Sequence, residues 1–338
     1  MTVKYDSCKI PKQTRLTAKV LFVTRKTALR EDASGSNMSN WTMSRQTRYL
    51  MILGRMIGTF VFWADAPHRR IVRRNLRFTH PHWPPEQIHR ISKRVFQNLG
   101  ITFLEICKLV SDTRDDVLAK AQISGLEHLT QALDKNKGLI IVSAHIGNWE
   151  LGLQYAACYL QQPIVGVAKK IRFRPLNQWV HRLRTRFGNK IIYKKGALPE
   201  MRQVLRRGGI VVLLVDQSRR SEGVDVTFLG RKVTATPAAA FLAIRCHSPV
   251  LPIFCVRESN GQLAIHVSSP LNFERTGDLR ADIQSSTQII TDEVERAVRK
   301  NPDQWLWLHK RWKKYYPDLY PEYQARRLRR KQRKERRR

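Results

Sequence analysis

The stretch Gly138-Leu-Ile-Ile-Val-Ser-Ala-His145-Ile-Gly-Asn-Trp-Glu150 is the most informative part of this chain. Its run of apolar, mostly β-branched residues predicts a buried strand that ends near His145. Gly147 and Asn148 predict a turn, and a helix-like segment begins at Trp149. The stretch therefore predicts a strand that delivers a histidine to a turn at the start of a helix.

His145 and Glu150 are the residues of this stretch that can carry chemistry. An imidazole titrates near neutral pH and can take a proton from a hydroxyl. A nearby carboxylate fixes its tautomer and stabilises the imidazolium. Positions 145 and 150 would lie on different faces of one helix. We therefore expect His145 to precede the helix, where the turn folds it back toward Glu150. The alternative interpretation is a structural histidine followed by an ordinary acidic residue in a first helical turn.

The charge of the chain indicates an anionic partner. The 338 residues include 62 Lys and Arg but only 27 Asp and Glu, which gives a formal net charge of +35. Candidate partners are a bilayer surface, a phosphorylated glycolipid, an acidic carrier protein or nucleic acid. The five cysteines show no Cys-x-x-Cys spacing. This favours reduced, buried thiols over disulfides or a zinc site.

Further motifs occur in order between about residues 50 and 315. They are Arg73-Arg74-Asn75-Leu76, Arg182-Leu-Arg184-Thr-Arg186-Phe-Gly188, a strand ending in Asp216-Gln217, Val226-Thr-Phe228-Leu-Gly230-Arg231 and Pro302-Asp-Gln304-Trp305-Leu-Trp307-Leu-His309-Lys-Arg311-Trp312. Together with His145-x4-Glu150, this series resembles the bacterial lipid A biosynthesis acyltransferases of the lauroyl/myristoyl type. These belong to the wider lysophospholipid acyltransferase superfamily.

The resemblance implies transfer of a fatty acyl chain from a thioester to a hydroxyl of a lipid A precursor. The donor would be acyl carrier protein, or coenzyme A, and no metal or other cofactor is expected. The chain would act at the cytoplasmic face of the bacterial inner membrane, with acyl carrier protein and anionic lipids as partners. His145 would be the general base, with Glu150 orienting it.

The resemblance also implies the remaining site residues. Lys170 falls near the place of a family arginine thought to stabilise the oxyanion, with Lys169 and Arg172 as substitutes. A lysine there supplies a point charge without the guanidinium fork. The residues expected to bind substrate are Asn148, Arg184, Arg186, Asp216, Gln217 and Arg231. For Asp216 a loop-bracing role is the alternative, and for the arginines a solvated surface charge.

After Gly125 the pattern alternates between helix and strand. Strands are expected at 138–145, 163–168, 190–195, 209–216, 249–257 and 262–268, the last two as a hairpin around Asn260-Gly261. Helices are expected near 84–110, 126–136, 150–161, 173–187, 197–207, 236–246 and 280–300. The alternation predicts an α/β fold with a mostly parallel central sheet flanked by helices, which matches the glycerol-phosphate-acyltransferase-like fold that the resemblance implies.

The two ends of the chain differ in composition from the α/β part. We expect a polar, basic segment at 1–44 that lacks clear periodicity, a membrane-associated helix at 45–66, an acyltransferase domain at 67–320 and a basic tail at 321–338. Met38, Met43 and Met51 offer alternative translation starts. A full span needs about 20 apolar residues. Arg55 interrupts the apolar run from Tyr49 to Ala64, which favours an interfacial helix over a span. A buried helix of the globular domain is the alternative.

Three rival functions stay open at this stage. The first is an acyltransferase that uses another glycolipid or phospholipid acceptor. The second is a nucleic-acid-binding protein, suggested by the charge, although zinc-finger spacing and RNA-recognition signatures are missing from the sequence. No nucleic acid is therefore expected as a partner. The third is a catalytically silent relative that acts as a membrane scaffold.

Overall fold

A computed structural model describes residues 45–193, 196–218 and 223–325, together with Gln332 and Glu335. The segment predicted at 1–44 and most of the basic tail lie outside the described residues. The predicted strand 190–195 is observed as far as Tyr193, and residues 194–195 lie outside the described part.

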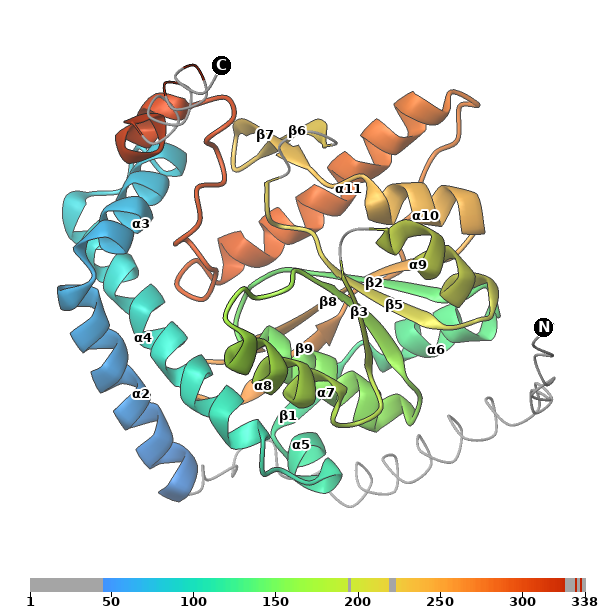
Figure 1. Cartoon of the computed structure of the whole chain (residues 1–338), viewed down its shortest axis with the longest axis horizontal. Coiled ribbons are helices and arrows are strands. Elements are labelled where there is room, and N and C mark those ends of the chain that lie inside the picture. The colour runs from blue at the N-terminus through green and yellow to red at the C-terminus, as the bar shows by residue number, and fades with distance from the viewer. Residues whose placement is uncertain (1–44, 194–195, 219–222, 326–331, 333–334, 336–338) are drawn as a thin grey trace. The chain divides into compact units, whose positions relative to one another are not determined.

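The centre of the fold is a seven-stranded sheet in the order β1-β9-β8-β2-β5-β3-β4 (Figure 1). All neighbouring pairs are parallel except β8 and β9, which run antiparallel. The predicted α/β class, the mostly parallel sheet and the hairpin at Asn260-Gly261 are therefore confirmed. The strands are β1 (Ala121–Ser124), β2 (Leu139–Ser143), β3 (Ile164–Ala168), β4 (Lys190–Tyr193), β5 (Ile210–Leu214), β8 (Val250–Arg257) and β9 (Leu263–Val267).

Helices cover both faces of the sheet. They are α4 (Pro85–Leu109), α5 (Arg114–Ala119), α6 (Leu126–Asp134), α7 (Trp149–Leu160), α8 (Arg174–Thr185), α9 (Ala197–Arg206), α10 (Ala238–Cys246) and α11 (Leu279–Lys300). Side chains of α6 and α7 face Ile141 and Val212 on one side. Side chains of α9, α10 and α11 face Val167 and Leu213 on the other. Val212 and Leu213 are neighbours in β5 and face opposite sides of the sheet. The fold therefore has three layers, with helices on each face of the central sheet.

The strands of a second, two-stranded sheet and strand β1 are not among those expected from the sequence. Strands β6 (Val224–Phe228) and β7 (Arg231–Ala235) pair antiparallel through Leu229 and Gly230. Both of these turn residues have positive φ, 51° and 70°. Leucine seldom adopts this conformation, so Leu229 gives no turn signal in the sequence.

The C-terminal aromatic segment is part of the core. Trp305, Trp307 and Trp312 are completely buried. Asn75, on α3 (Ala66–Thr79), donates from its side-chain amide to the carbonyls of Trp307 and His309. The chain then passes through a 3-10 turn, η1 (Pro317–Leu319). Two sequence motifs about 230 residues apart thus meet through one buried asparagine.

The N-terminal helix α2 (Arg45–Ala64) packs closely along α4 (Figure 1). Glycines make this approach possible, because a Cβ on Gly58 would lie 2.2 Å from the Phe96 carbonyl oxygen. A Cβ on Gly100 would lie equally close, 2.2 Å, to the Gly54 carbonyl oxygen. Among the described residues no single helix is both long and apolar enough to cross a membrane; α2 and α3 pass that test only as a pair bent by 93°.

The glycine contact predicts that Gly58→Ala destabilises the protein. Alanine alone would favour the helix by up to about 1 kcal/mol, but overpacking against backbone costs about 1–3 kcal/mol. We expect a lower unfolding midpoint in urea for detergent-solubilised protein. Met56→Ala, at a 64% exposed position of the same helix, is the control and should leave the midpoint nearly unchanged. A Gly58→Ala protein as stable as the wild type would contradict the close contact.

Candidate active site

His145 lies just beyond β2 and is held by Asp216, which lies just beyond β5. The His145 Nδ1–H donates to Asp216 Oδ1 over 2.8 Å, and the His145 backbone N–H donates to Oδ2 over 3.0 Å. A third donor, the indole N–H of Trp305, reaches Oδ2 over 2.9 Å. Asp216 is fully buried, so these donors replace the water it loses.

The topology of the sheet brings the two residues together. Strands β2 and β5 are parallel neighbours, with Ser143 paired to Leu214 at their carboxyl ends. Residues that follow both strands therefore emerge at the same edge. Gly147 turns the chain after His145 with φ of 56°, and a Cβ there would lie 2.1 Å from the Cys255 carbonyl oxygen. Only glycine fits this turn without strain.

The electrostatics of the pair favour a histidine base. Burial alone would lower the pKa of His145, but the charge and hydrogen bond of Asp216 raise that pKa above its usual range. Burial alone would raise the pKa of Asp216, yet the charge of His145 and its hydrogen bonds hold that pKa well below the usual range. Asp216 is thus a carboxylate at neutral pH. With Nδ1 donating to it, Nε2 of neutral His145 is left as an acceptor.

Glu150 has a different partner from the one expected. It lies in the first turn of α7 and accepts a hydrogen bond from Arg184 Nε to Oε2 over 3.0 Å, with a second bond from Arg184 Nη2. The carboxylate at His145 Nδ1 is that of Asp216, so the expected pairing of Glu150 with His145 is corrected. The reason is geometric: the first turn of α7 points Glu150 toward α8, whereas β5 delivers Asp216 beside β2. The negative charge of Glu150 still contributes to raising the pKa of His145.

Asn148 has a structural place beside this site. It caps α7, because its side-chain oxygen accepts from the Leu151 backbone N–H, and it is buried. Its amide donates to Glu105, which also accepts from Arg257 over 2.7 Å. The amide group expected to bind substrate is therefore occupied within the fold, and through Asn148 the Glu105–Arg257 pair contacts the turn that follows His145.

The other predicted basic residues are spread over several surfaces. Arg186 donates to the Leu109 carbonyl oxygen over 2.6 Å, and Arg231 donates to that of Phe78 over 3.2 Å. Lys170 is exposed and lines a separate hollow of about 620 Å³ with Arg172 and Arg174. In the described part of the chain, no hydrogen bond or ion pair joins Lys170 to His145. Arg184 is the arginine whose charge acts on the pKa of His145.

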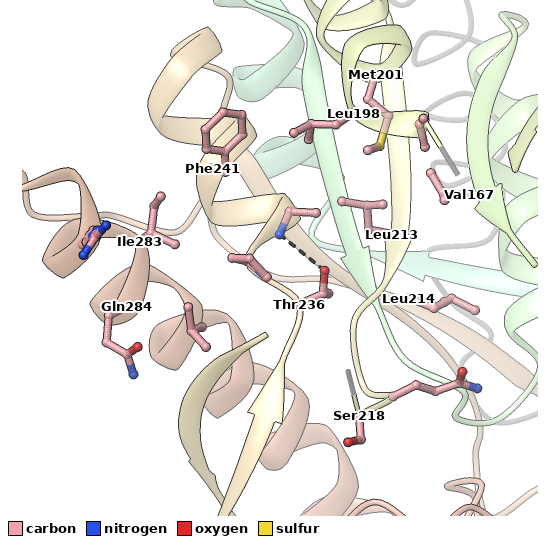
Figure 2. Close-up of a pocket in the computed structure, with 17 residues that line it drawn as sticks. Val167, Leu198, Met201, Leu213, Leu214, Ser218, Thr236, Phe241, Ile283 and Gln284 are labelled. Atoms are coloured by element: carbon pink, nitrogen blue, oxygen red, sulfur yellow. Dashed lines mark hydrogen bonds between the residues drawn. The ribbon is translucent and has the colours of Figure 1, made fainter. Parts of the chain in front are cut away.

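Gln217 connects the histidine to a mainly apolar cavity. Its side-chain nitrogen lies 3.4 Å from His145 Nε2, and the same residue lines a cavity of about 720 Å³. Figure 2 shows apolar side chains from β5, α9, α10 and α11 around this cavity, among them Leu213, Met201, Phe241 and Ile283. Its volume is within the range of about 300–1,000 Å³ that is common for ligand sites.

A buried histidine–carboxylate pair beside an apolar cavity, on an α/β sheet, is an arrangement suited to an enzyme that transfers acyl chains. The family model of the bacterial lipid A biosynthesis acyltransferases matches residues 44–314, and the chain belongs to this family. The resemblance inferred from the motifs is therefore confirmed.

Individual relatives agree with this assignment. A lipid A biosynthesis acyltransferase of Haemophilus influenzae is 23% identical over 78% of this chain and 82% of its own length. The lipid A biosynthesis lauroyltransferase of Escherichia coli is 23% identical over 77% of this chain and 84% of its own. A phosphatidylinositol mannoside acyltransferase of Mycobacterium tuberculosis is 25% identical over 56% of this chain and 59% of its own.

The hydrogen bond between His145 and Asp216 predicts how His145 titrates. Asp216→Asn removes the negative charge that raises the pKa of His145, so this pKa should fall below that of the wild type. The pH dependence of His145 modification by diethyl pyrocarbonate, read by peptide mass spectrometry, measures it, because only neutral imidazole reacts. Asp225→Asn, on a surface aspartate paired with Lys232, is the control and should not move the midpoint. An unchanged midpoint in Asp216→Asn would show that the two groups are not coupled.

Proposed function

We propose that the protein transfers a fatty acyl chain from acyl carrier protein to a hydroxyl of a lipid A precursor, with His145 as general base and Asp216 orienting it. The observation that carries the proposal is the position of His145 Nε2. Because Nδ1 donates to Asp216, this nitrogen keeps the lone pair that can take a proton, and it accepts a 3.4 Å hydrogen bond from the Gln217 amide at the edge of the apolar cavity. The names of the lipid A relatives support the acceptor class.

The proposed reaction is a direct transfer. His145 Nε2 takes the proton of the acceptor hydroxyl as its oxygen attacks the thioester carbonyl carbon. The tetrahedral oxyanion collapses, the carbon–sulfur bond breaks, and the imidazolium returns its proton to the leaving thiolate. The acyl chain would lie in the cavity of about 720 Å³ lined by Leu213, Met201 and Phe241. The step needs no metal or bound cofactor.

Positive charge is required where the oxyanion forms. Arg184 is already oriented by Glu150 and acts electrostatically on His145, so we assign the stabilising charge to Arg184. Lys170, in its separate basic hollow with Arg172 and Arg174, is better suited to bind an anionic headgroup or the acidic carrier protein. Breaking the largely buried Glu150–Arg184 pair from either side should then reduce catalysis.

Loss of the base should abolish transfer. With labelled acyl carrier protein thioester and a lipid A precursor, we expect His145→Ala to lower the rate by about 10²–10⁴-fold, and Asp216→Ala to lower it to a similar extent. His266→Ala removes the histidine of a surface pair with Glu258 and should keep full activity. Wild-type transfer only to another membrane lipid, such as a phosphatidylinositol mannoside, would replace the acceptor but keep the base. If the wild type transferred no acyl chain to any acceptor, the proposal would be contradicted.

We also propose that α2 places the enzyme on the cytoplasmic face of the bacterial inner membrane. Met51, Gly54, Gly58 and Phe62 form its buried face. On its outer side the exposed apolar residues are Tyr49, Ile52, Leu53, Met56, Phe60, Val61 and Trp63. An exposed apolar surface of this kind, which includes the exposed Arg55 and is followed by the arginine-rich α3, is typical of a helix that lies in the interface of an anionic bilayer.

The membrane proposal predicts that Phe60→Ser combined with Trp63→Ser weakens binding to vesicles of phosphatidylethanolamine and phosphatidylglycerol. Two large exposed side chains, 72% and 59% accessible, would no longer enter the bilayer. We expect at least tenfold weaker binding in vesicle flotation at high salt, which screens the arginines. Leu176→Ser, at an exposed position of α8, is the control. Equal flotation of the double variant and the wild type would contradict this role of α2.

A further inference from the structure

Trp305 contacts the catalytic pair through both its side chain and its backbone. Its indole N–H donates to Asp216 Oδ2 over 2.9 Å, and its backbone forms an isolated antiparallel bridge with Ile146. On either side of it, the Leu306 N–H donates to the His145 carbonyl oxygen and the Gln304 carbonyl oxygen accepts from the Gly147 N–H. Residues 304–306 thus hold the turn that runs from His145 to Gly147.

The surroundings of Trp305 show why Asp216 depends on it. Asp216 is fully buried, and its Oδ2 has two donors, the indole and the His145 amide. The ring of His309 packs 5.0 Å from that of Trp305, and its Nδ1 donates to the Leu306 carbonyl oxygen. Burial lowers the pKa of His309 to about 4, so this histidine is neutral at pH 7. The indole is neutral as well. It stabilises the negative charge of Asp216 by a hydrogen bond and adds no positive charge.

We propose that Trp305 is a positioning residue for acyl transfer, which sets how strongly Asp216 binds the His145 proton by donating to the other carboxylate oxygen. The proposal rests on the proposed function for its catalytic consequence, but the geometry can be tested without turnover. The charged or titratable groups that face His145 are Asp216 after β5, Glu150 on α7, Arg184 on α8 and His309 in the C-terminal segment.

The expected effect has a definite sign. Trp305→Phe keeps an aromatic ring but removes the N–H, so the Asp216 charge is less shared and attracts the His145 proton more strongly. The pKa of His145 should rise, and the acid limb of the kcat/KM profile should move upward by about 0.5 pH unit. A hydrogen bond to a charged group is lost, so we expect kcat to fall about tenfold with little change in KM.

Trp307→Phe is the matched control. Trp307 is as fully buried as Trp305, but its indole donates to the Pro302 carbonyl oxygen. Both variants create a similar cavity and lose one indole hydrogen bond, so both should lose stability. Only Trp305→Phe should shift the titration of His145.

The experiment compares the wild type with the two variants in the full-length, detergent-solubilised protein. It measures the pH midpoint of His145 modification by diethyl pyrocarbonate and the pH profile of transfer from acyl carrier protein. An upward shift in Trp305→Phe alone supports the proposal. An unmoved midpoint in Trp305→Phe, or the same shift in Trp307→Phe, overturns it. If the wild type transfers no acyl chain but the midpoints still differ as expected, the proposed function fails and the positioning role stands.

Discussion

The site depends on one buried carboxylate, because Asp216 has no water to satisfy it and must receive its donors from the protein. Those donors come from parts of the chain far apart in sequence: the side chain and amide of His145, and the indole of Trp305. The sheet core and the C-terminal segment must both be in place before the carboxylate is satisfied. The C-terminal segment therefore has to be folded for the hydrogen bonds of Asp216 to be complete.

The same requirement explains the supporting contacts. Asn75 ties α3 to the backbone of Trp307 and His309, so the helix that follows α2 is connected to the segment that holds Asp216. Glycines on α2 and α4 let the helix with the exposed apolar face lie directly against the domain. In the proposed arrangement, the membrane-facing helix is thus linked to the base through packed, buried contacts and not through a flexible linker.

The sequence predicted the parts of this account that depend on local pattern. The periodicity after Gly125 predicts the α/β class. The series of motifs identifies His145 and Glu150 as candidate site residues and indicates the family. The partner of His145 could not be predicted from spacing, because it depends on β5 lying next to β2 in the sheet, and strand order is a tertiary property. Asp216 was identified only as a substrate-binding or bracing residue. Trp305 gave no signal for its role, since a buried tryptophan in a core and one that donates to a carboxylate look the same in sequence.

If His145 is the base, it carries its proton on Nδ1, bound to Asp216, and its Nε2 holds the lone pair that faces Gln217. Nitrogen NMR of protein labelled with ¹⁵N-histidine measures this directly, with His145→Gln identifying the signal among the ten histidines. Above the pKa of His145, the account predicts a protonated Nδ1 with a strongly downfield proton and an unprotonated Nε2, a state that Asp216→Asn weakens. A proton on Nε2 in the wild type would contradict the account, since His145 then has no lone pair facing the cavity.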